Sequence, residues 1–274
     1  MELQDKIEQL IGEQKREWPQ LDLAIEQISN IRTKEFSWGE SNNVIIQFNP
    51  NLTSSDLYTN SNECYLCEDN RPKMQRGIQF ADKYIILVNP YPILCNHLTI
   101  ALHSHVSQRI RKKIGDMLKL AKELPDYIVC YDGPSSGAST SNHFHFQAGL
   151  RTDILMQGDN ELRTCLTIES ESKEEVEESF EDVYYYLNSI QPNEVEPMMN
   201  IIAFVDGGKY VLNIYPRKKF QPSRYNEIGK RNLLINPRAI DMAGNIIISR
   251  EEGFDKIKKE DIEDIYTQVS MSII

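Results

Sequence analysis

Positive charge, long apolar runs and histidine are all scarce in this chain. Its 274 residues include 30 lysines and arginines against 41 acidic residues, which gives a formal net charge of -11 at pH 7. This charge argues against a general nucleic-acid binder, because phosphate contacts favour a basic surface. No run of about 18 or more apolar residues is present, and the first residues are too charged for a signal peptide. We therefore expect a cytoplasmic protein without a membrane partner.

Cysteine is scarce as well, with five residues in the whole chain. A chain of this length can bury a sizeable core and does not need disulfide staples. Two of the cysteines form Cys64-Tyr65-Leu66-Cys67, here called the cysteine clip, and this spacing is typical of a reduced metal site. All five histidines lie between His97 and His145, which predicts that they form a single site.

Apolar periodicity predicts an α+β fold with an antiparallel sheet. The expected strands are 44–48, 84–88, 97–102, 127–131, 142–149, 200–205, 210–215, 233–235 and 245–248, and the main expected helices are 107–124, 172–189 and one from about residue 259. A weak similarity between two segments, each a strand followed by Asn-Pro-Tyr-Pro or by Tyr-Pro-Arg, suggests a diverged internal duplication. We divide the chain into a helical segment 1–43, a first half 44–170 and a second half 171–274.

The strand at 142–149 is expected to carry the chemistry. Its period of two places His143, His145 and Gln147 on one face and the intervening apolar residues in the core. Alternate side chains lie about 7 Å apart along a strand, a spacing that suits separate roles around one phosphoryl group. An imidazole nitrogen is a good nucleophile toward phosphorus, and a glutamine amide can donate to a phosphate oxygen. The alternative is a purely structural or metal-binding role for the histidines.

Two loops are candidate phosphate-binding segments. The small-residue loop before the histidine strand offers backbone N–H groups and hydroxyls. A later loop concentrates basic side chains, although an ordinary solvated surface loop explains it equally well. The expected phosphate-binding residues are Gly137, Ser139, Thr140 and Ser141 in the first loop and Arg217, Lys218 and Arg224 in the second.

The cysteine clip supplies two of the four ligands that a tetrahedral zinc ion requires. We expect the other two from the histidine cluster, with His143 and His105 as first choice and His97 and His103 as alternatives. Such a site would be closed and structural. The competing interpretation is that both thiols are free.

Several motifs together resemble the histidine-triad superfamily over about residues 44–150. The motifs are Asn89-Pro90-Tyr91-Pro92, His97-Leu98-Thr99-Ile100, His105-Val106-Ser107-Gln108 and His143-Phe144-His145-Phe146-Gln147. With the cysteine clip, His-x-His-x-Gln resembles the galactose-1-phosphate uridylyltransferase branch. The segment 141–148 is similar to the GDP-L-galactose and GDP-glucose phosphorylases, and the whole chain resembles an uncharacterised bacterial family related to them.

This resemblance implies a histidine-triad-like antiparallel sheet and a role for each motif residue. His145 would be the nucleophile, Gln147 would bind phosphoryl oxygens, and Thr140 would stand where the family has a phosphate-contacting serine. The implied zinc ligands are Cys64, Cys67, His105 and His143. Asp132 and Ala138 depart from the asparagine and glycine that relatives often have at these places.

The implied activity is nucleotidyl transfer or phosphorolysis through a covalent nucleotidyl-histidine. The first candidate substrate is a nucleoside diphosphate hexose such as a GDP-hexose, and the acceptor would be phosphate or a sugar phosphate. Glutamine in place of a third histidine favours transfer or phosphorolysis over hydrolysis in the family. The alternatives are a dinucleotide polyphosphate (Ap4A-type) phosphorylase or hydrolase and a non-catalytic nucleotide-binding protein. The sequence leaves the oligomeric state open.

Overall fold

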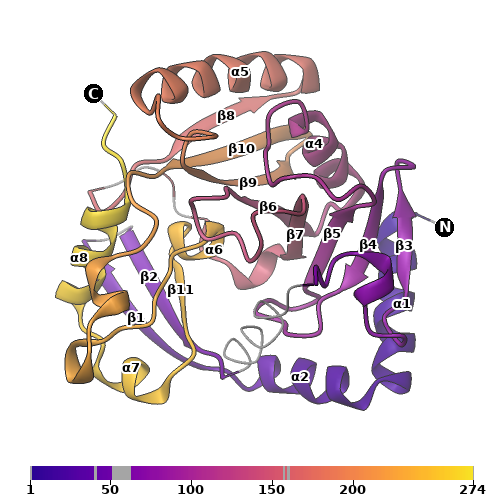
Figure 1. Ribbon diagram of the computed structural model, residues 1–274, viewed down its shortest axis with the longest axis horizontal. Coiled ribbons are helices and arrows are strands. Elements are labelled where there is room, and N and C mark those ends of the chain that lie inside the picture. The colour runs from indigo at the N-terminus through magenta and orange to yellow at the C-terminus, as the bar shows by residue number, and fades with distance from the viewer. Residues whose placement is uncertain (1, 40–41, 51–62, 157, 159–160, 274) are drawn as a thin grey trace.

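A large antiparallel sheet runs through the protein, as expected for an α+β chain (Figure 1). The computed structural model describes residues 2–39, 42–50, 63–156, 158 and 161–273. The sheet has eight strands in the order β3 (Gly77–Phe80), β4 (Tyr84–Val88), β5 (Leu98–Leu102), β7 (His145–Leu150), β6 (Tyr127–Asp132), β9 (Met199–Asp206), β10 (Lys209–Pro216) and β8 (Leu166–Ser170). Because β6 pairs with β9, the segments 44–170 and 171–274 contribute to one continuous sheet.

A second, smaller sheet pairs two strands from the N-terminal part of the chain with one strand from the C-terminal part. Its order is β1 (Arg32–Trp38), β2 (Asn42–Phe48) and β11 (Asn245–Ile248), with β11 parallel to β2. The helical part of the expected segment 1–43 consists of α1 (Leu3–Glu17) and α2 (Pro19–Ser29). The rest of the segment contains β1, a strand that the description of 1–43 as helical did not include. There every second residue is partly buried, which is the period of a strand.

The two faces of the large sheet are covered by different layers. On β6, alternate residues such as Val129 pack with α1, α4 (Ile114–Glu123) and α5 (Lys173–Ile190). The residues between them, such as Ile128, pack with the small sheet and the C-terminal helices. These helices are α6 (Ala239–Met242), α7 (Glu251–Lys256) and α8 (Lys259–Val269). Among the described helices, none has the length and apolar character required to cross a membrane.

The expected helix 107–124 is shorter in the structure, where it begins at Ile114. The reason is Gln108, whose side-chain amide donates to the backbone carbonyls of Asp132 at 3.1 Å and His145 at 2.9 Å. The Oε1 atom of Gln108 also accepts from the backbone N–H of His145 at 2.8 Å. These tertiary hydrogen bonds stabilise a non-helical path that the local pattern does not reveal. They also hold the first residue of β7 in place.

In the second half, the expected helix 172–189 and the following hairpin are present, and residues 233–235 differ. Helix α5 begins after Ser172, whose side chain accepts the N-cap hydrogen bond from Glu175. The β9–β10 hairpin turns at Gly207 and Gly208, whose φ values of 54° and 87° suit a two-residue turn. Residues 233–235, expected as a strand, form an irregular segment, although Leu233 and Ile235 are buried as in a strand pattern.

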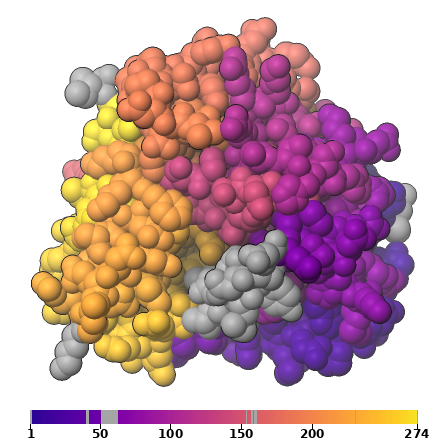
Figure 2. Space-filling model, in the orientation of Figure 1, coloured from indigo at the N-terminus to yellow at the C-terminus, as the bar shows by residue number. Residues whose placement is uncertain are grey.

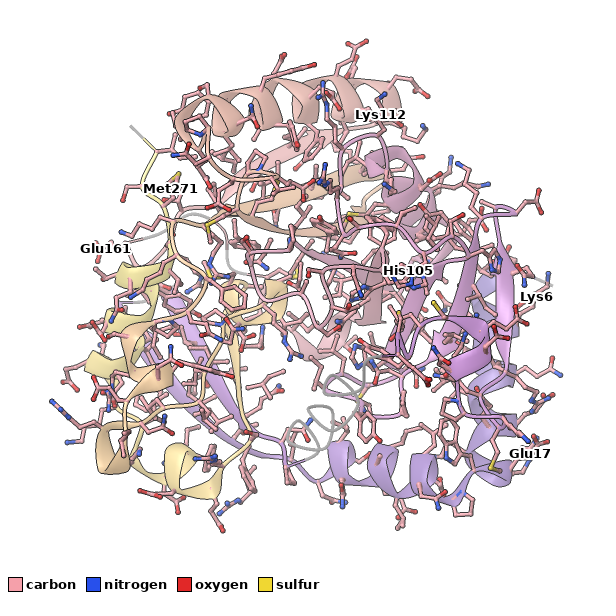
Figure 3. The ribbon with its side chains drawn as sticks, in the orientation of Figure 1. Lys6, Glu17, His105, Lys112, Glu161 and Met271 are labelled. Carbon is pink, nitrogen blue, oxygen red and sulfur yellow. The ribbon has the colours of Figure 1, made fainter. Side chains whose placement is uncertain are left out.

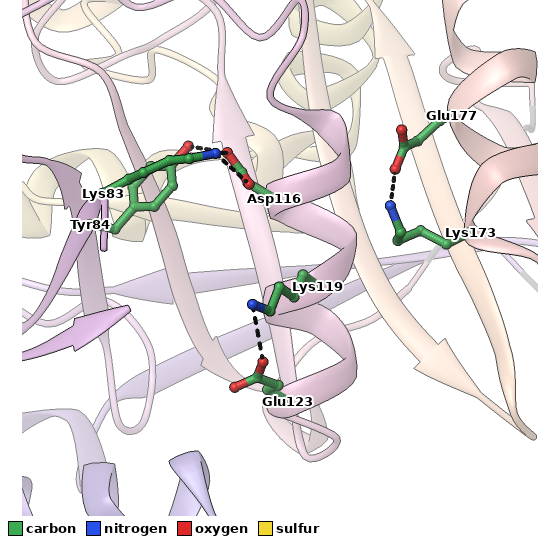
Figure 4. Close-up of polar contacts among 7 residues, drawn as sticks. All are labelled: Lys83, Tyr84, Asp116, Lys119, Glu123, Lys173 and Glu177. Carbon is green, nitrogen blue, oxygen red and sulfur yellow. Dashed lines mark hydrogen bonds and ion pairs between the residues drawn. The ribbon is translucent and has the colours of Figure 1, made fainter. Parts of the chain in front are cut away.

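Helix α4 is attached to the sheet through Asp116 (Figure 4). Its carboxylate accepts a hydrogen bond from the Tyr84 phenol at 2.9 Å and pairs with Lys83 at 3.4 Å. The other pairs drawn in Figure 4 are Lys119 with Glu123 and Lys173 with Glu177. Pairs of this kind along one helix typically contribute about 0.3–0.5 kcal/mol each. The helix is therefore held mainly by its buried apolar face and by Asp116.

Candidate active site

A pocket of about 280 Å³ lies where the large sheet meets the C-terminal layer. Its lining comes from the cysteine clip, from β5 and β7, and from residues 225–249 of the C-terminal part. On the face drawn in Figure 2, violet and magenta segments lie on one side and orange and yellow segments on the other. Of the expected site residues, Gly137, Ser139, His145 and Gln147 line this pocket.

His145 presents its Nε2 atom as a free base. Its Nδ1 atom lies 2.9 Å from the backbone carbonyl of His143, and a carbonyl can only accept, so Nδ1 carries the proton. The Nε2 atom lies 3.1 Å from the Ser139 hydroxyl at the pocket. Burial lowers the pKa of His145 to about 4, against a raising effect of the hydrogen bond to His143. A neutral ring with its lone pair on Nε2 is the nucleophilic form of imidazole.

His97 orients the amide of Gln147, a role that the sequence did not reveal. The backbone N–H of Ile93 donates to Nδ1 of His97 at 3.2 Å, so the ring proton is on Nε2. This Nε2–H donates to Oε1 of Gln147 at 2.9 Å, which leaves the Gln147 NH₂ group to donate into the pocket. Burial lowers the pKa of His97 to about 4 and keeps the ring neutral. The only signal in the sequence was its place in the His97-Leu98-Thr99-Ile100 motif.

The structure brings together the four residues expected as zinc ligands. The ligand atoms of Cys64, Cys67, His105 and His143 all lie within 4.8 Å of one another. Nδ1 of His143 is 3.2 Å from the Cys64 sulfur, and Nδ1 of His105 is 3.1 Å from the Cys67 sulfur. His105, labelled in Figure 3, lies on the connection between β5 and α4.

The geometry of this cluster fits a tetrahedral metal ion. Bond lengths of about 2.0 Å to nitrogen and 2.3 Å to sulfur place tetrahedral ligand atoms roughly 3.3–3.8 Å apart. Nε2 of His143 lies 2.7 Å from the carbonyl of Leu102, so it carries the proton and Nδ1 directs its lone pair at the thiols. The two alternative ligands lie elsewhere: His97 contacts Gln147, and the Nε2 atom of His103 is 2.6 Å from Gln79.

The small-residue loop divides into residues at the pocket and residues outside its described lining. Gly137 has a φ of 92°, and a Cβ atom there would lie 2.8 Å from a backbone carbonyl oxygen, so the position requires glycine. Ser139 supplies the hydroxyl beside His145. Thr140 instead bonds a side chain of its own loop, and the carbonyl of Ser141 accepts from Gln108. Of these two hydroxyls, that of Ser139 lies at the pocket, and Thr140 is not among the described lining residues.

The basic loop lies apart from the described lining of the pocket. Arg217 is completely buried, and its guanidinium donates to the side chain of Asn200 and to the carbonyl of Pro237, both at 2.7 Å. Lys218 is exposed, and Arg224 pairs with Asp261. We therefore propose no phosphate contact for Arg217, Lys218 or Arg224. The sequence could not show that this loop turns into the interface between the two layers.

Asp132 has a structural role in the same interface. Its Oδ1 atom accepts from the Asn200 amide and from the backbone N–H of Ala239, both at 2.7 Å. These bonds connect β6 to β9 and to the start of α6. Burial raises the pKa of Asp132, while its hydrogen bonds and nearby arginines lower it. Asp132 therefore contacts the C-terminal layer and is not among the described lining residues of the pocket.

Arg238 is the pocket residue that sequence reasoning missed. It is the only arginine or lysine among the described lining residues, and it directly precedes α6. Its charge contributes to the lowered pKa values of His97 and His145. No local sequence motif indicates that Arg238 lines the pocket, because its position depends on how the C-terminal layer packs against the large sheet.

The α+β fold described above is shared with solved structures of low sequence identity. Three structures of yeast Ap4A phosphorylase Apa2 share this fold. The uncomplexed enzyme has a TM-score of 0.63 at 14% identity, covering 91% of this chain and 97% of that one. The AMP complex gives 0.63 at 17% identity and 98% of each chain, and the Ap4A complex gives 0.56 at 14%, with 91% and 97% covered.

The sequence comparison places the chain in a family. Residues 10–150 match the model described as "Domain of unknown function (DUF4922)", and the protein belongs to this family. None of the curated proteins compared with the chain matches it. The expected α+β fold is confirmed by the fold shared with these structures.

Proposed function

We propose that this protein is a nucleotide phosphorylase that carries a nucleotidyl group on Nε2 of His145. The observation that carries the proposal is the pairing of a neutral, pocket-facing Nε2 atom with the oriented amide of Gln147. The fold shared with an Ap4A phosphorylase supports a dinucleotide polyphosphate as substrate. We therefore place an Ap4A-type dinucleotide ahead of the nucleotide sugar.

The reaction takes two displacements at one phosphorus atom. The Nε2 lone pair of His145 attacks the α-phosphorus, the bond from that phosphorus to the bridging oxygen breaks, and the remaining polyphosphate nucleotide leaves with the electron pair. An oxygen of inorganic phosphate then attacks the same phosphorus and the P–N bond breaks. The products are a nucleoside diphosphate and the neutral histidine. Nδ1 of His145 keeps its proton throughout and donates to the carbonyl of His143, which stabilises the charged adduct.

The neighbouring residues stabilise the charge that develops on phosphorus. The Gln147 amide donates to a non-bridging oxygen, because its own oxygen is occupied by His97. Arg238 supplies a positive charge from the opposite layer. The apolar lining residues Leu66, Pro72 and Leu87 suit a nucleobase.

We further propose zinc as the metal of the Cys64, Cys67, His105 and His143 cluster. Two thiolates and two imidazoles form a closed tetrahedral set, which supplies folding free energy and leaves no open position for substrate. The ion would join the cysteine clip to the start of the histidine strand. The residues of the pocket, and not the metal, then carry the chemistry.

Intact mass spectrometry tests the proposed reaction. The protein is incubated with Ap4A in the absence of inorganic phosphate, and we expect a mass increase of one adenylyl group. The adduct should be absent from His145→Ala and present in His103→Ala, a control histidine that contacts Gln79 outside the described lining. Added phosphate should discharge it as ADP. An undiminished adduct in His145→Ala would refute the assignment.

A nucleotide-sugar substrate is the second candidate, because the segment 141–148 resembles the GDP-hexose phosphorylases. The same experiment with GDP-glucose should then give a guanylyl adduct and release hexose 1-phosphate. Tight nucleotide binding without an adduct from either substrate would identify a non-catalytic nucleotide-binding protein and overturn both enzyme proposals.

A further inference from the structure

A line of hydroxyl groups connects the cysteine clip to the proposed nucleophile. The Tyr65 phenol oxygen lies 2.9 Å from the Ser139 hydroxyl oxygen, which lies 3.1 Å from Nε2 of His145. Tyr65 and Ser139 both line the pocket. In the sequence, Tyr65 lies between the two cysteines of the clip, which are candidate metal ligands. Its side chain lines the pocket.

The hydrogen bonds of this line can point in only one direction. Nδ1 of His145 donates to a carbonyl, so its Nε2 atom must accept and the Ser139 hydroxyl must donate to it. A serine hydroxyl has a single proton, so the Tyr65 phenol must be the donor to Ser139. In the substrate-free protein the lone pair of His145 is thus occupied by Ser139, and Ser139 is held in turn by Tyr65.

The cysteine clip determines where Tyr65 lies. The backbone N–H of Cys67 donates to the carbonyl of Cys64 at 3.1 Å, and the Asn70 amide donates to the same carbonyl at 3.0 Å. Both thiols approach His143, which precedes His145 by two residues. An ion bound by the four ligands would therefore fix the turn that carries Tyr65 relative to the strand that carries the nucleophile.

We propose that Tyr65 is a positioning residue through which the metal cluster sets the orientation of Ser139 and the availability of Nε2 of His145. When a phosphoryl group enters, Ser139 leaves Nε2 and its hydroxyl turns to a non-bridging oxygen, with Tyr65 holding the new orientation. The catalytic meaning of this relay rests on the proposed function. The geometry of the relay and its dependence on the metal do not rest on the proposed function. The relay and the function can therefore be tested separately.

Nitrogen-15 NMR of the imidazole side chains tests the relay without turnover. The chain has only five histidines, which makes assignment of the Nε2 signal of His145 practical. We expect Tyr65→Phe in the zinc-loaded protein to shift this signal in the same direction as Ser139→Ala. Tyr225→Phe is the matched control, because it also removes one phenol hydroxyl from a residue lining the pocket. A shift in Tyr65→Phe no larger than in Tyr225→Phe would overturn the relay.

Removal of the metal tests the coupling to the cluster. Chelation should shift the His145 signal in the wild type and have little further effect in Tyr65→Phe. An equal shift in both proteins would show that Tyr65 does not transmit the state of the cluster. If chelation unfolds the protein, the variant His105→Ala is used in place of chelation to weaken metal binding. His105 is chosen because it is the exposed histidine of the four proposed ligands.

The kinetic consequence separates this inference from the proposed function. With Ap4A as substrate, we expect Tyr65→Phe to lower kcat about tenfold with a smaller change in KM, the effect of one hydrogen bond made in the transition state. An unchanged kcat in a protein that still forms the His145 adduct would overturn the relay and leave the proposed function standing. Absence of the adduct from the wild type would overturn the proposed function, while the NMR result still decides whether the relay exists.

Discussion

Replacement of His97 by alanine should slow the reaction by misdirecting the side-chain amide of Gln147. The His97 ring accepts from the Ile93 N–H and donates to the Gln147 oxygen, so it distinguishes the two ends of the amide. Without the ring, the amide can present its oxygen to the pocket as readily as its NH₂ group. The oxygen would repel a phosphoryl group where the NH₂ group would bind it.

The size of the effect follows from the single hydrogen bond that orients the amide. A net contribution of about 1–1.5 kcal/mol per hydrogen bond corresponds to roughly a tenfold loss of the correct orientation. The same substitution leaves the Ile93 N–H buried without its acceptor, which should cost about 1–3 kcal/mol of folding stability. Both losses are small compared with the abolition of adduct formation expected for His145→Ala.

A double-mutant cycle measures whether the effect passes through Gln147. The rate of adduct formation is followed by quenched-flow mass spectrometry in the wild type, His97→Ala, Gln147→Ala and the double variant. We expect His97→Ala to slow the wild type about tenfold and to have little further effect once Gln147 is alanine. Denaturant unfolding of the same proteins reports the stability loss independently. Additive effects of the two substitutions on the rate would refute the reasoning.

Four further predictions follow from individual contacts. Burial raises the pKa of Glu196 from 4.5 to about 7, so the folded state binds this proton more tightly, and the associated stability is present below pH 4.5 and lost as the pH rises through 7. Relative to Glu196→Gln, the unfolding free energy of the wild type should fall by about 3 kcal/mol over this range in denaturant titrations, whereas parallel pH profiles would contradict the assignment. Gly137→Ala should destabilise the protein by about 1–3 kcal/mol in thermal melts, whereas Gly12→Ala, a helical position with open space around it, should not. Arg238→Met should weaken AMP binding in calorimetry by about tenfold or more, and an effect of equal size in the exposed control Arg231→Met would argue against a specific contact. Protein purified without chelator should contain one zinc ion per chain by elemental analysis and lose it in Cys67→Ser; a metal-free wild type would exclude the zinc proposal.

The sequence by itself determined the features that depend on backbone periodicity and short spacing. The alternation around His145 placed Phe144 and Phe146 in the core, because successive strand residues face opposite sides. The turn between strands 200–205 and 210–215 and the start of the helix near residue 172 were visible for the same local reason. The cysteine clip and the histidine motifs together indicated the four residues that cluster in the structure as candidate metal ligands.

Only the tertiary structure decided which distant residues meet at the pocket. Gln108 lies within a helical pattern, yet its bonds to Asp132 and His145 outweigh the local preference. Arg217 reads as a surface cation and is buried between the layers, whereas Arg238 has no motif and reaches the pocket. The physical reason is that a side chain's partners depend on which faces of the two layers pack together. That packing is a sum over many apolar contacts, which no short segment of the chain contains.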